Sequence, residues 1–373
     1  MTTSPPPRRP KRSRANLHNL SLTTKEDWNR YVNAPRRTQP DTLSPKELDA
    51  LSERAAREYN RRRLDWHANL GPFKTPQYQT LQSDLWNIVD SNLQDGHKVK
   101  GAIAVDSPAG VGKTTTLQHF AKEVHLQQIA DEGERTDSGH ERWPVCWVSL
   151  TGQPTMREVN RSMLSFFAHP GSDRGTATQY VRRALDCVLN CEVRLLVIDD
   201  LHFLRWPSAN GMEVSNHFKF IANTFPVTLV FIGVGLVRSG LLDEGRRLAN
   251  DDVLAQTRRR TTVLGLDDFN LATREGRLAW RQLLLSVERR IVLANAGRGM
   301  VADVLRDYLY GRSGGHIGSL MTLINRGCAM AIRTGTEALT GELLDNVKLD
   351  AAAEEKRAET EAALRSGALT TRP

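Results

Sequence analysis

The feature that most constrains this chain is a glycine-bearing loop between an apolar stretch and an amphipathic helical pattern. The loop reads Ser-Pro-Ala-Gly-Val-Gly-Lys-Thr over residues 107–114. Residues 102–105 before it are apolar and strand-like, and after it apolar residues recur at helical spacing from Leu117 to Val124. A strand, a glycine loop and a helix in this order are typical of a phosphate-binding loop. The alternative interpretation is an ordinary glycine turn before a helix.

The residue types of this loop suit a phosphorylated ligand. Gly110 and Gly112 let the backbone turn tightly and point its N–H groups at phosphate oxygens. Lys113 can reach the β- and γ-phosphates, and the Thr114 hydroxyl can ligate Mg²⁺. Ser107 stands where the usual pattern has its first glycine, a position that needs a small residue. The residues predicted to bind ATP are Ser107, Pro108, Ala109, Gly110, Val111, Gly112, Lys113, Thr114 and Thr115.

A second motif is an apolar strand that ends in two carboxylates, Arg-Leu-Leu-Val-Ile-Asp-Asp at 194–200. This is the Walker B arrangement, in which Asp199 would hold Mg²⁺ through water and Asp200 would polarise the attacking water. Many proteins of this kind have glutamate at the second place, and the shorter aspartate indicates slow hydrolysis. Two acids also cap many plain strand-to-turn junctions, but their presence beside the loop motif favours the nucleotide interpretation.

The order of strand and helix patterns predicts an α/β fold. Strand-like segments alternate with helical ones, which indicates a mostly parallel sheet covered on both faces. Beyond residue 266 only helical patterns follow, and Ala and mixed charge dominate the C-terminus. The predicted strands are 101–106, 144–150, 194–199, 227–233 and 262–266. The predicted parts are a disordered basic arm (1–20), a helical extension (21–70), the α/β core (71–266), a helical lid (267–349) and a flexible tail (350–373).

Charge indicates a polyanionic partner. The chain carries a formal net charge of +8, and its sequence pI is about 9.5. Residues 1–20 hold five cations and no acid, which fits either a nucleic-acid contact or a solubilising tail. No run of eighteen apolar residues exists and the first residues lack a signal-peptide core, so we expect a cytoplasmic protein with no membrane partner. The four scattered cysteines predict reduced, mostly buried thiols and no metal site.

The two motifs and the two-part layout resemble the AAA+ ATPases, and within them the TniB/TnsC family of transposition regulators. The resemblance rests on residues 107–114, on 194–200 with the Leu-His-Phe that follows, on 256–260 and on 313–320. It covers roughly residues 70 to 350. It implies an AAA+ P-loop core with a parallel five-stranded sheet. It further implies an ATP-dependent protein that self-associates into a ring or helical filament on duplex DNA, without sequence preference, and recruits or activates a DDE transposase.

The resemblance also implies roles for arginines near the last strand. In such oligomers an arginine of the neighbouring subunit contacts the γ-phosphate and links assembly to ATP. The candidates are Arg258, Arg259 and Arg260, for which a solvated basic run is the alternative. His202 could sense the nucleotide or be a plain histidine.

Two departures from the AAA+ pattern predict a slow switch rather than a fast motor. Val234 stands where many AAA+ proteins have a polar sensor, and residues 314–318 lack the arginine that many lids aim at the phosphates.

No motif places the DNA contact. Arg157, Arg161, Arg182 and Arg183 are candidates, with exposed helix charges as the alternative. Two other classes of function stay open. A helicase loader or replication initiator shares the core, but an initiator is expected to carry a helix-turn-helix module at its C-terminus, and 351–373 shows none. A signalling NTPase that binds protein partners fits the basic arm less well. A small-molecule kinase fits the lid and the arginine run poorly.

Overall fold

The computed structural model describes residues 19–95, 97–150, 155–201, 209–237 and 260–373, with the side chains of 209–215 excepted. Its core is a five-stranded sheet in the order β2-β3-β4-β1-β5, and every strand pair is parallel. This confirms the α/β fold with a parallel sheet. The strands are β1 (Ala102–Asp106), β2 (Val145–Ser149), β3 (Leu195–Asp199), β4 (Thr228–Gly233) and β5 (Thr261–Leu264).

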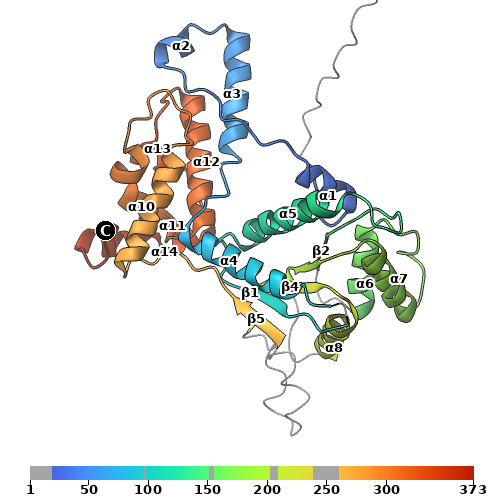
Figure 1. Ribbon diagram of the computed structural model, residues 1–373. Helices are drawn as coiled ribbons and strands as arrows, with labels where there is room; N and C mark the ends of the chain where they lie inside the picture. Colours follow the sequence, from blue (N-terminus) through green and yellow to red (C-terminus); the bar gives the residue numbers. More distant parts are fainter. Residues whose placement is uncertain (1–18, 96, 151–154, 202–208, 238–259) are drawn as a thin grey trace, which may run out of the picture.

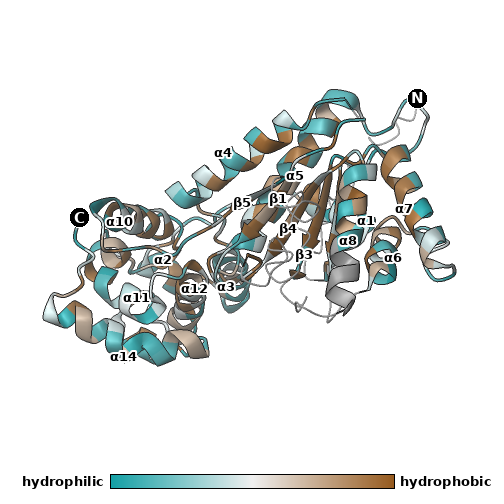
Figure 2. Cartoon of the chain, turned by 90° about the horizontal axis from the view of Figure 1, so that it is seen from below, coloured by the Kyte–Doolittle hydropathy of each residue, from teal (hydrophilic) through white to brown (hydrophobic). Residues whose placement is uncertain are grey.

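The strands are apolar because helices pack on the sheet, and Figure 2 shows them as the most hydrophobic part of the fold. Helices α1, α4 and α5 form one packed group, and α6, α7 and α8 form another (Figure 1). Threonine side chains cap the first turns of α4, α6 and α7. The core helices are α4 (Pro76–Ser91), α5 (Lys113–Glu132), α6 (Met156–Phe166), α7 (Ala177–Asn190) and α8 (Ala209–Thr224).

The C-terminal part is a helical bundle with a hydrophobic core of its own. Trp280, Leu284, Leu320 and Ile324 are fully buried in it, separate from the cluster around the sheet. Figure 1 shows this bundle beside the sheet. Its elements are α10 (Arg274–Glu288), the short π-helix η2 (Met300–Val304), α11 (Arg306–Ser313), α12 (Ile317–Thr334), α13 (Gly341–Asp345) and α14 (Ala351–Ser366).

The N-terminal extension is divided between the two cores. Trp28 of α1 (Lys25–Val32) is buried against the sheet, stacks on Trp147 and donates to His125 Nδ1 at 3.1 Å. After α2 (Pro45–Asp49), helix α3 (Glu53–His67) packs on α12 in the lid. The extension therefore contacts both the sheet and the lid.

A buried ion pair fastens α3 to the lid. Arg63, only 1% exposed, donates to both carboxylate oxygens of Glu337 at 2.6 and 2.8 Å. The neighbouring His67 Nε2 accepts from the amide of Val292 at 3.0 Å, and burial lowers the pKa of His67 to about 4. The neutral imidazole is the form that can accept this bond.

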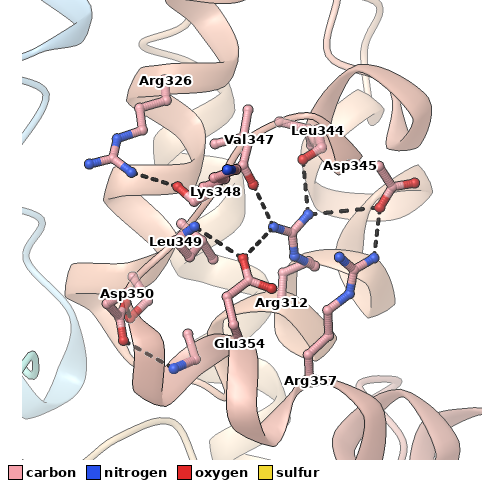
Figure 3. Close-up of polar contacts among 12 residues, drawn as sticks. Arg312, Arg326, Leu344, Asp345, Val347, Lys348, Leu349, Asp350, Glu354 and Arg357 are labelled. Atoms are coloured by element: carbon pink, nitrogen blue, oxygen red, sulfur yellow. Dashed lines mark hydrogen bonds and ion pairs between the residues drawn. The ribbon is translucent and has the colours of Figure 1, made fainter.

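The flexible tail predicted for 350–373 is wrong. Helix α14 begins at an Asp350 cap, packs on α11 and ends at Ser366, and Thr371 beyond it is fully buried. Figure 3 shows how Arg312 of α11 holds this region, by donating to the carbonyls of Leu344 and Val347 and to Glu354 of α14. Alanine and mixed charge are also the composition of a helix with i,i+4 ion pairs, and the burial of its partners could not be seen in the sequence.

The cysteines are free thiols, as predicted. Cys146 and Cys328 are buried, and Cys187 and Cys191 are half-buried. Burial raises the pKa of Cys187 to about 12 and that of Cys191 to about 11. Within the described part of the chain, no group of three or more His, Cys, Asp or Glu side chains is placed to hold a metal ion.

Replacing Arg63 by alanine tests the attachment of α3. The change leaves the Glu337 carboxylate buried without its counter-charge, so we expect a loss of about 3–5 kcal/mol in the free energy of unfolding. Arg57→Ala is the matched control, because Arg57 pairs with Glu53 on the exposed face of the same helix, and it should cost less than about 1 kcal/mol. Urea unfolding of both variants measures the difference. Equal losses would contradict a special role for the buried pair.

Candidate nucleotide site

The glycine loop connects the end of β1 to the start of α5. Gly110 and Gly112 have φ angles of 79° and 89°, in the left-handed region that glycine adopts without a Cβ penalty. Lys113 begins α5, so the first-turn amides of this helix face the loop. Lys113 is buried, Thr114 is half-buried and Thr115 is exposed. The loop therefore has the backbone shape that an anion-binding turn requires.

Ser107 has a role that its small size alone did not predict. Its hydroxyl oxygen accepts a hydrogen bond from the amide of Leu266 at 2.6 Å. Leu266 lies in the segment that leaves β5 toward the lid. A glycine at 107 could not make this bond, so the serine ties the start of the loop to the lid connection.

The ammonium group of Lys113 lies over the loop. It donates to the carbonyls of Ser107 at 2.8 Å and Pro108 at 2.5 Å. Burial lowers the pKa of Lys113, and the nearby carboxylates of Asp106 and Asp199 act in the opposite direction. A buried cation with carbonyl partners is placed to exchange them for an anionic ligand.

Asp199 ends β3 at the same edge of the sheet as the loop, because parallel strands all point their carboxyl ends to one edge. It is 6% exposed, and burial raises its pKa to about 6, partly opposed by the amide of Asp200 and by Lys113. Carboxylate and hydroxyl oxygens are ligands that suit Mg²⁺, so the residue types at 199 and 114 fit the ion. Asp199 and Thr114 are the residues that would hold the ion.

Asp200 adopts an unusual backbone conformation with φ 61°. Its Oδ2 accepts a hydrogen bond from the hydroxyl of Ser149 at 3.0 Å, and Ser149 pairs with Asp199 in the β2–β3 register. The left-handed backbone of a non-glycine residue at this position directs the second carboxylate toward the end of β2. Sequence reasoning did not identify Ser149 as its partner.

The end of β4 is held by a residue that the sequence analysis did not single out. Asp106 accepts from the amides of Gly235 at 2.6 Å and Val237 at 2.9 Å. Val234, at the predicted sensor position, is 43% exposed. A carboxylate directly before the glycine loop was a visible signal that its side chain could organise the neighbouring turn.

The predicted arginines and the histidine are only partly placed. Arg260 is exposed, and its guanidinium donates to Asn223 of α8 at 2.7 Å. Arg258, Arg259 and His202 lie outside the described residues. Of these residues the structure therefore places only Arg260, whose guanidinium contacts α8 rather than the loop.

The lid contacts the loop through its backbone. The amide of Gly318, in the first turn of α12, donates to the carbonyl of Gly110 at 2.8 Å. A Cβ atom at 318 would stand 2.8 Å from that same oxygen, so the contact requires glycine. Ile317 beside it lies against Gly112. A helix N-terminus thus stands where many lids supply an arginine.

A small cavity of about 20 Å³ lies between the first turn of α4, the loop and the lid. The amide oxygen of Gln77 is buried and has no hydrogen-bond partner. A buried acceptor without a donor is costly. The lining residues are Thr75, Gln77, Val111, Leu266, Asp267, Asp268, Phe269, Gly315 and Ile317.

Comparison with known proteins identifies the fold. Residues 96–239 match the family model described as AAA domain. The solved structure of Cdc6p from Pyrobaculum aerophilum matches with a TM-score of 0.50 and 16% identity over 72% of this chain and 65% of that protein. The ORC1 protein of Aeropyrum pernix, solved in complex with DNA, matches with a TM-score of 0.52 and 14% identity over 81% of this chain and 71% of that protein. A search of curated proteins found no match.

The site and the sheet order define a P-loop protein, and the matches place its fold among the AAA+ P-loop folds. The TniB/TnsC type is not among these findings. The alignment spans just under two thirds of the Pyrobaculum protein. No helix among the described residues is long and apolar enough to cross a membrane.

Asp199→Asn is expected to stabilise the ligand-free protein at neutral pH. Because burial raises the folded-state pKa of Asp199 to about 6 from 3.8, the folded protein holds this proton more tightly than the unfolded chain. Wild-type stability should therefore fall as pH rises through this window. The variant should be more stable by roughly 2–3 kcal/mol above pH 7 and by little below about pH 4. Thermal unfolding from pH 4 to 8 measures this, and a pH-independent difference would contradict it.

Gly318→Ala should separate the lid from the loop. The added methyl group meets the carbonyl of Gly110, a backbone atom that cannot rotate away, so we expect nucleotide affinity to fall about tenfold. Gly297→Ala is the control within the lid, because a Cβ there meets nothing within 4 Å. Titration with a fluorescent ATP analogue compares the two. Unchanged affinity in Gly318→Ala would show that lid contact is not needed for binding.

Proposed function

We propose that this protein binds ATP with Mg²⁺ at the loop 107–115 and hydrolyses it slowly, as a switch. The observation that carries the proposal is that buried Lys113 and buried Asp199 lie beside the glycine loop at one edge of the sheet. Lys113 would bind the β- and γ-phosphates. Thr114 and Asp199 would hold the ion, which supplies charge stabilisation when bound.

Slow turnover follows from the surroundings of the second acid. Asp200 would orient the attacking water, yet its carboxylate is bonded to Ser149. Val234 offers no polar side chain, and Gly318 stands in place of a lid arginine. Fewer polar groups around the γ-phosphate leave less transition-state charge stabilised. Turnover as fast as that of a processive helicase would contradict this part.

We further propose that the ATP-bound protein self-associates on duplex DNA without sequence preference. The net charge of +8 and the basic arm support a polyanionic partner. One of Arg258, Arg259 and Arg260 would contact the γ-phosphate of a neighbouring subunit. The structural likeness to an initiator protein solved with DNA is compatible with this role.

For the biological process we propose regulation of transposition, with recruitment or activation of a DDE transposase at the target. The motifs at 107–114, 194–200 and 313–320 support this role through their resemblance to TniB/TnsC proteins. The second candidate is a replication initiator or helicase loader, which the likeness to Cdc6p and ORC1 favours. Nucleotide-dependent binding to duplex DNA of any sequence favours the first candidate. A preference for single-stranded DNA or for one duplex sequence favours the second.

Electron microscopy with duplex DNA and a non-hydrolysable ATP analogue tests the central proposal. Rings or spirals on DNA that require the analogue are the expected result. Binding should also weaken steeply with salt, because phosphate contacts release counterions. Monomers that ignore DNA, or salt-insensitive and sequence-specific binding, would count against it.

Lys113→Ala should abolish nucleotide binding and, with it, assembly on DNA. Asp200→Asn is the matched variant, since it should keep ATP binding and assembly while hydrolysis falls at least about a hundredfold. Equilibrium nucleotide binding, phosphate release and microscopy on both variants separate binding from hydrolysis. Assembly of Lys113→Ala that matches wild type would break the proposed link between ATP and self-association.

A further inference from the structure

An arginine cluster forms where the extension crosses the lid. After α1, the chain runs past the C-terminal end of α10, where the side-chain Nε2 of Gln39 donates to the carbonyl of Arg289 at 3.1 Å. Arg36 and Arg37 precede this contact, and Arg290 follows Arg289. We call these four residues, Arg36, Arg37, Arg289 and Arg290, the arginine cluster. Its elements lie on the lid side of the molecule (Figure 1).

The position of the cluster is fixed by contacts on its inner side. The indole of Trp66 in α3 donates to the carbonyl of Arg290 at 2.7 Å. The guanidinium of Arg290 donates to the carbonyl of Leu70 and lies 4.6 Å from the ring centroid of Phe73. Arg36 and Arg289 are exposed. Two segments far apart in sequence are thus held together with their arginines in one place.

The nearby acids leave most of this charge uncompensated. Asp65 pairs with Arg37 at 3.7 Å. Glu288 accepts from the backbone amides at the start of η2 at 2.8 to 3.0 Å, and Glu337 pairs with Arg63.

No ion pair within the part of the chain that the structure describes involves Arg36, Arg289 or Arg290. Burial lowers the pKa of Arg290, and the charge of Arg36 adds to this effect.

Bringing several positively charged side chains together costs electrostatic free energy, and a bound anion would offset this cost. The C-terminus of α10 offsets part of this cost through its dipole, but only within the last turn. The guanidinium group of an arginine can donate two parallel hydrogen bonds to phosphate oxygens. Exposed arginines supplied by two segments match a ligand with several phosphates in a row, as in a nucleic-acid backbone.

We propose that the arginine cluster is a contact surface for the phosphates of duplex DNA, outside the nucleotide site. The inference rests on the proposed DNA-binding function and assigns that function to specific residues. It differs from the candidates at Arg157, Arg161, Arg182 and Arg183 in the core. Because the extension and the lid both contribute to this surface, DNA affinity would depend on the position of the lid.

The test is the double variant Arg36→Gln/Arg289→Gln, whose side chains are exposed. The matched control is Lys356→Gln/Arg365→Gln, which removes the same charge from exposed positions of α14. Affinity for a duplex of mixed sequence is measured against salt concentration with an ATP analogue present. We expect the cluster variant to bind about tenfold more weakly and to lower the salt slope by about 2, with little change in the control.

The outcomes separate this inference from the wider proposal. Nucleotide affinity and thermal stability should stay at wild-type values in both variants. If wild type binds duplex DNA and the two variants lose affinity equally, the cluster has no special role and the inference is overturned. If the wild-type protein binds no duplex DNA in any nucleotide state, both the proposed DNA-binding function and this inference fail. Loss of binding to acidic phospholipid vesicles without loss of DNA binding would also overturn it.

Discussion

The hydrogen bond from the amide of Gly318 in the lid to the carbonyl of Gly110 in the glycine loop joins the two parts of this protein. Both partners are glycines for steric reasons, since one has a left-handed φ and the other has no space for a Cβ. Ser107 adds a second bond from the loop to the segment that enters the lid. The glycine loop is therefore also the place where the lid contacts the core. Any ligand that changes the loop acts on the lid directly.

Buried charge explains how such a site could work as a switch. Lys113 is desolvated and held by carbonyls of its own loop, and Asp199 is desolvated enough to raise its pKa to about 6. Burial disfavours the charged form of both groups. A nucleotide phosphate would pair with Lys113, and a divalent ion would pair with Asp199. Binding of both ligands would therefore stabilise this region of the protein. Asp200, bonded to Ser149, is the group that such a rearrangement would have to release.

The N-terminal extension gives the lid a second attachment. Trp28 fixes its first helix to the sheet, while Arg63 and His67 fix α3 to the lid. The extension thus spans the joint between the two cores on the side where the arginine cluster lies. The sequence predicted a helical extension over 21–70, but not that the two ends of this extension join different cores. The partners of Arg63 and His67 lie more than 220 residues away in the chain.

Strand patterning and glycine-loop chemistry are local, so the amino-acid sequence was enough to predict the parallel sheet and to locate the two motifs. The capping box at Ser44 is local in the same way, because its partner Glu47 lies within the same turn. Features that depend on partners far along the chain became visible only in the fold. Tertiary packing sets three such contacts. They are Ser149 with Asp200, Gly318 with Gly110, and Arg312 with α14. The composition of 350–373 is compatible with either a free tail or a docked helix. The helix docks because the buried guanidinium of Arg312 donates to Glu354 of α14.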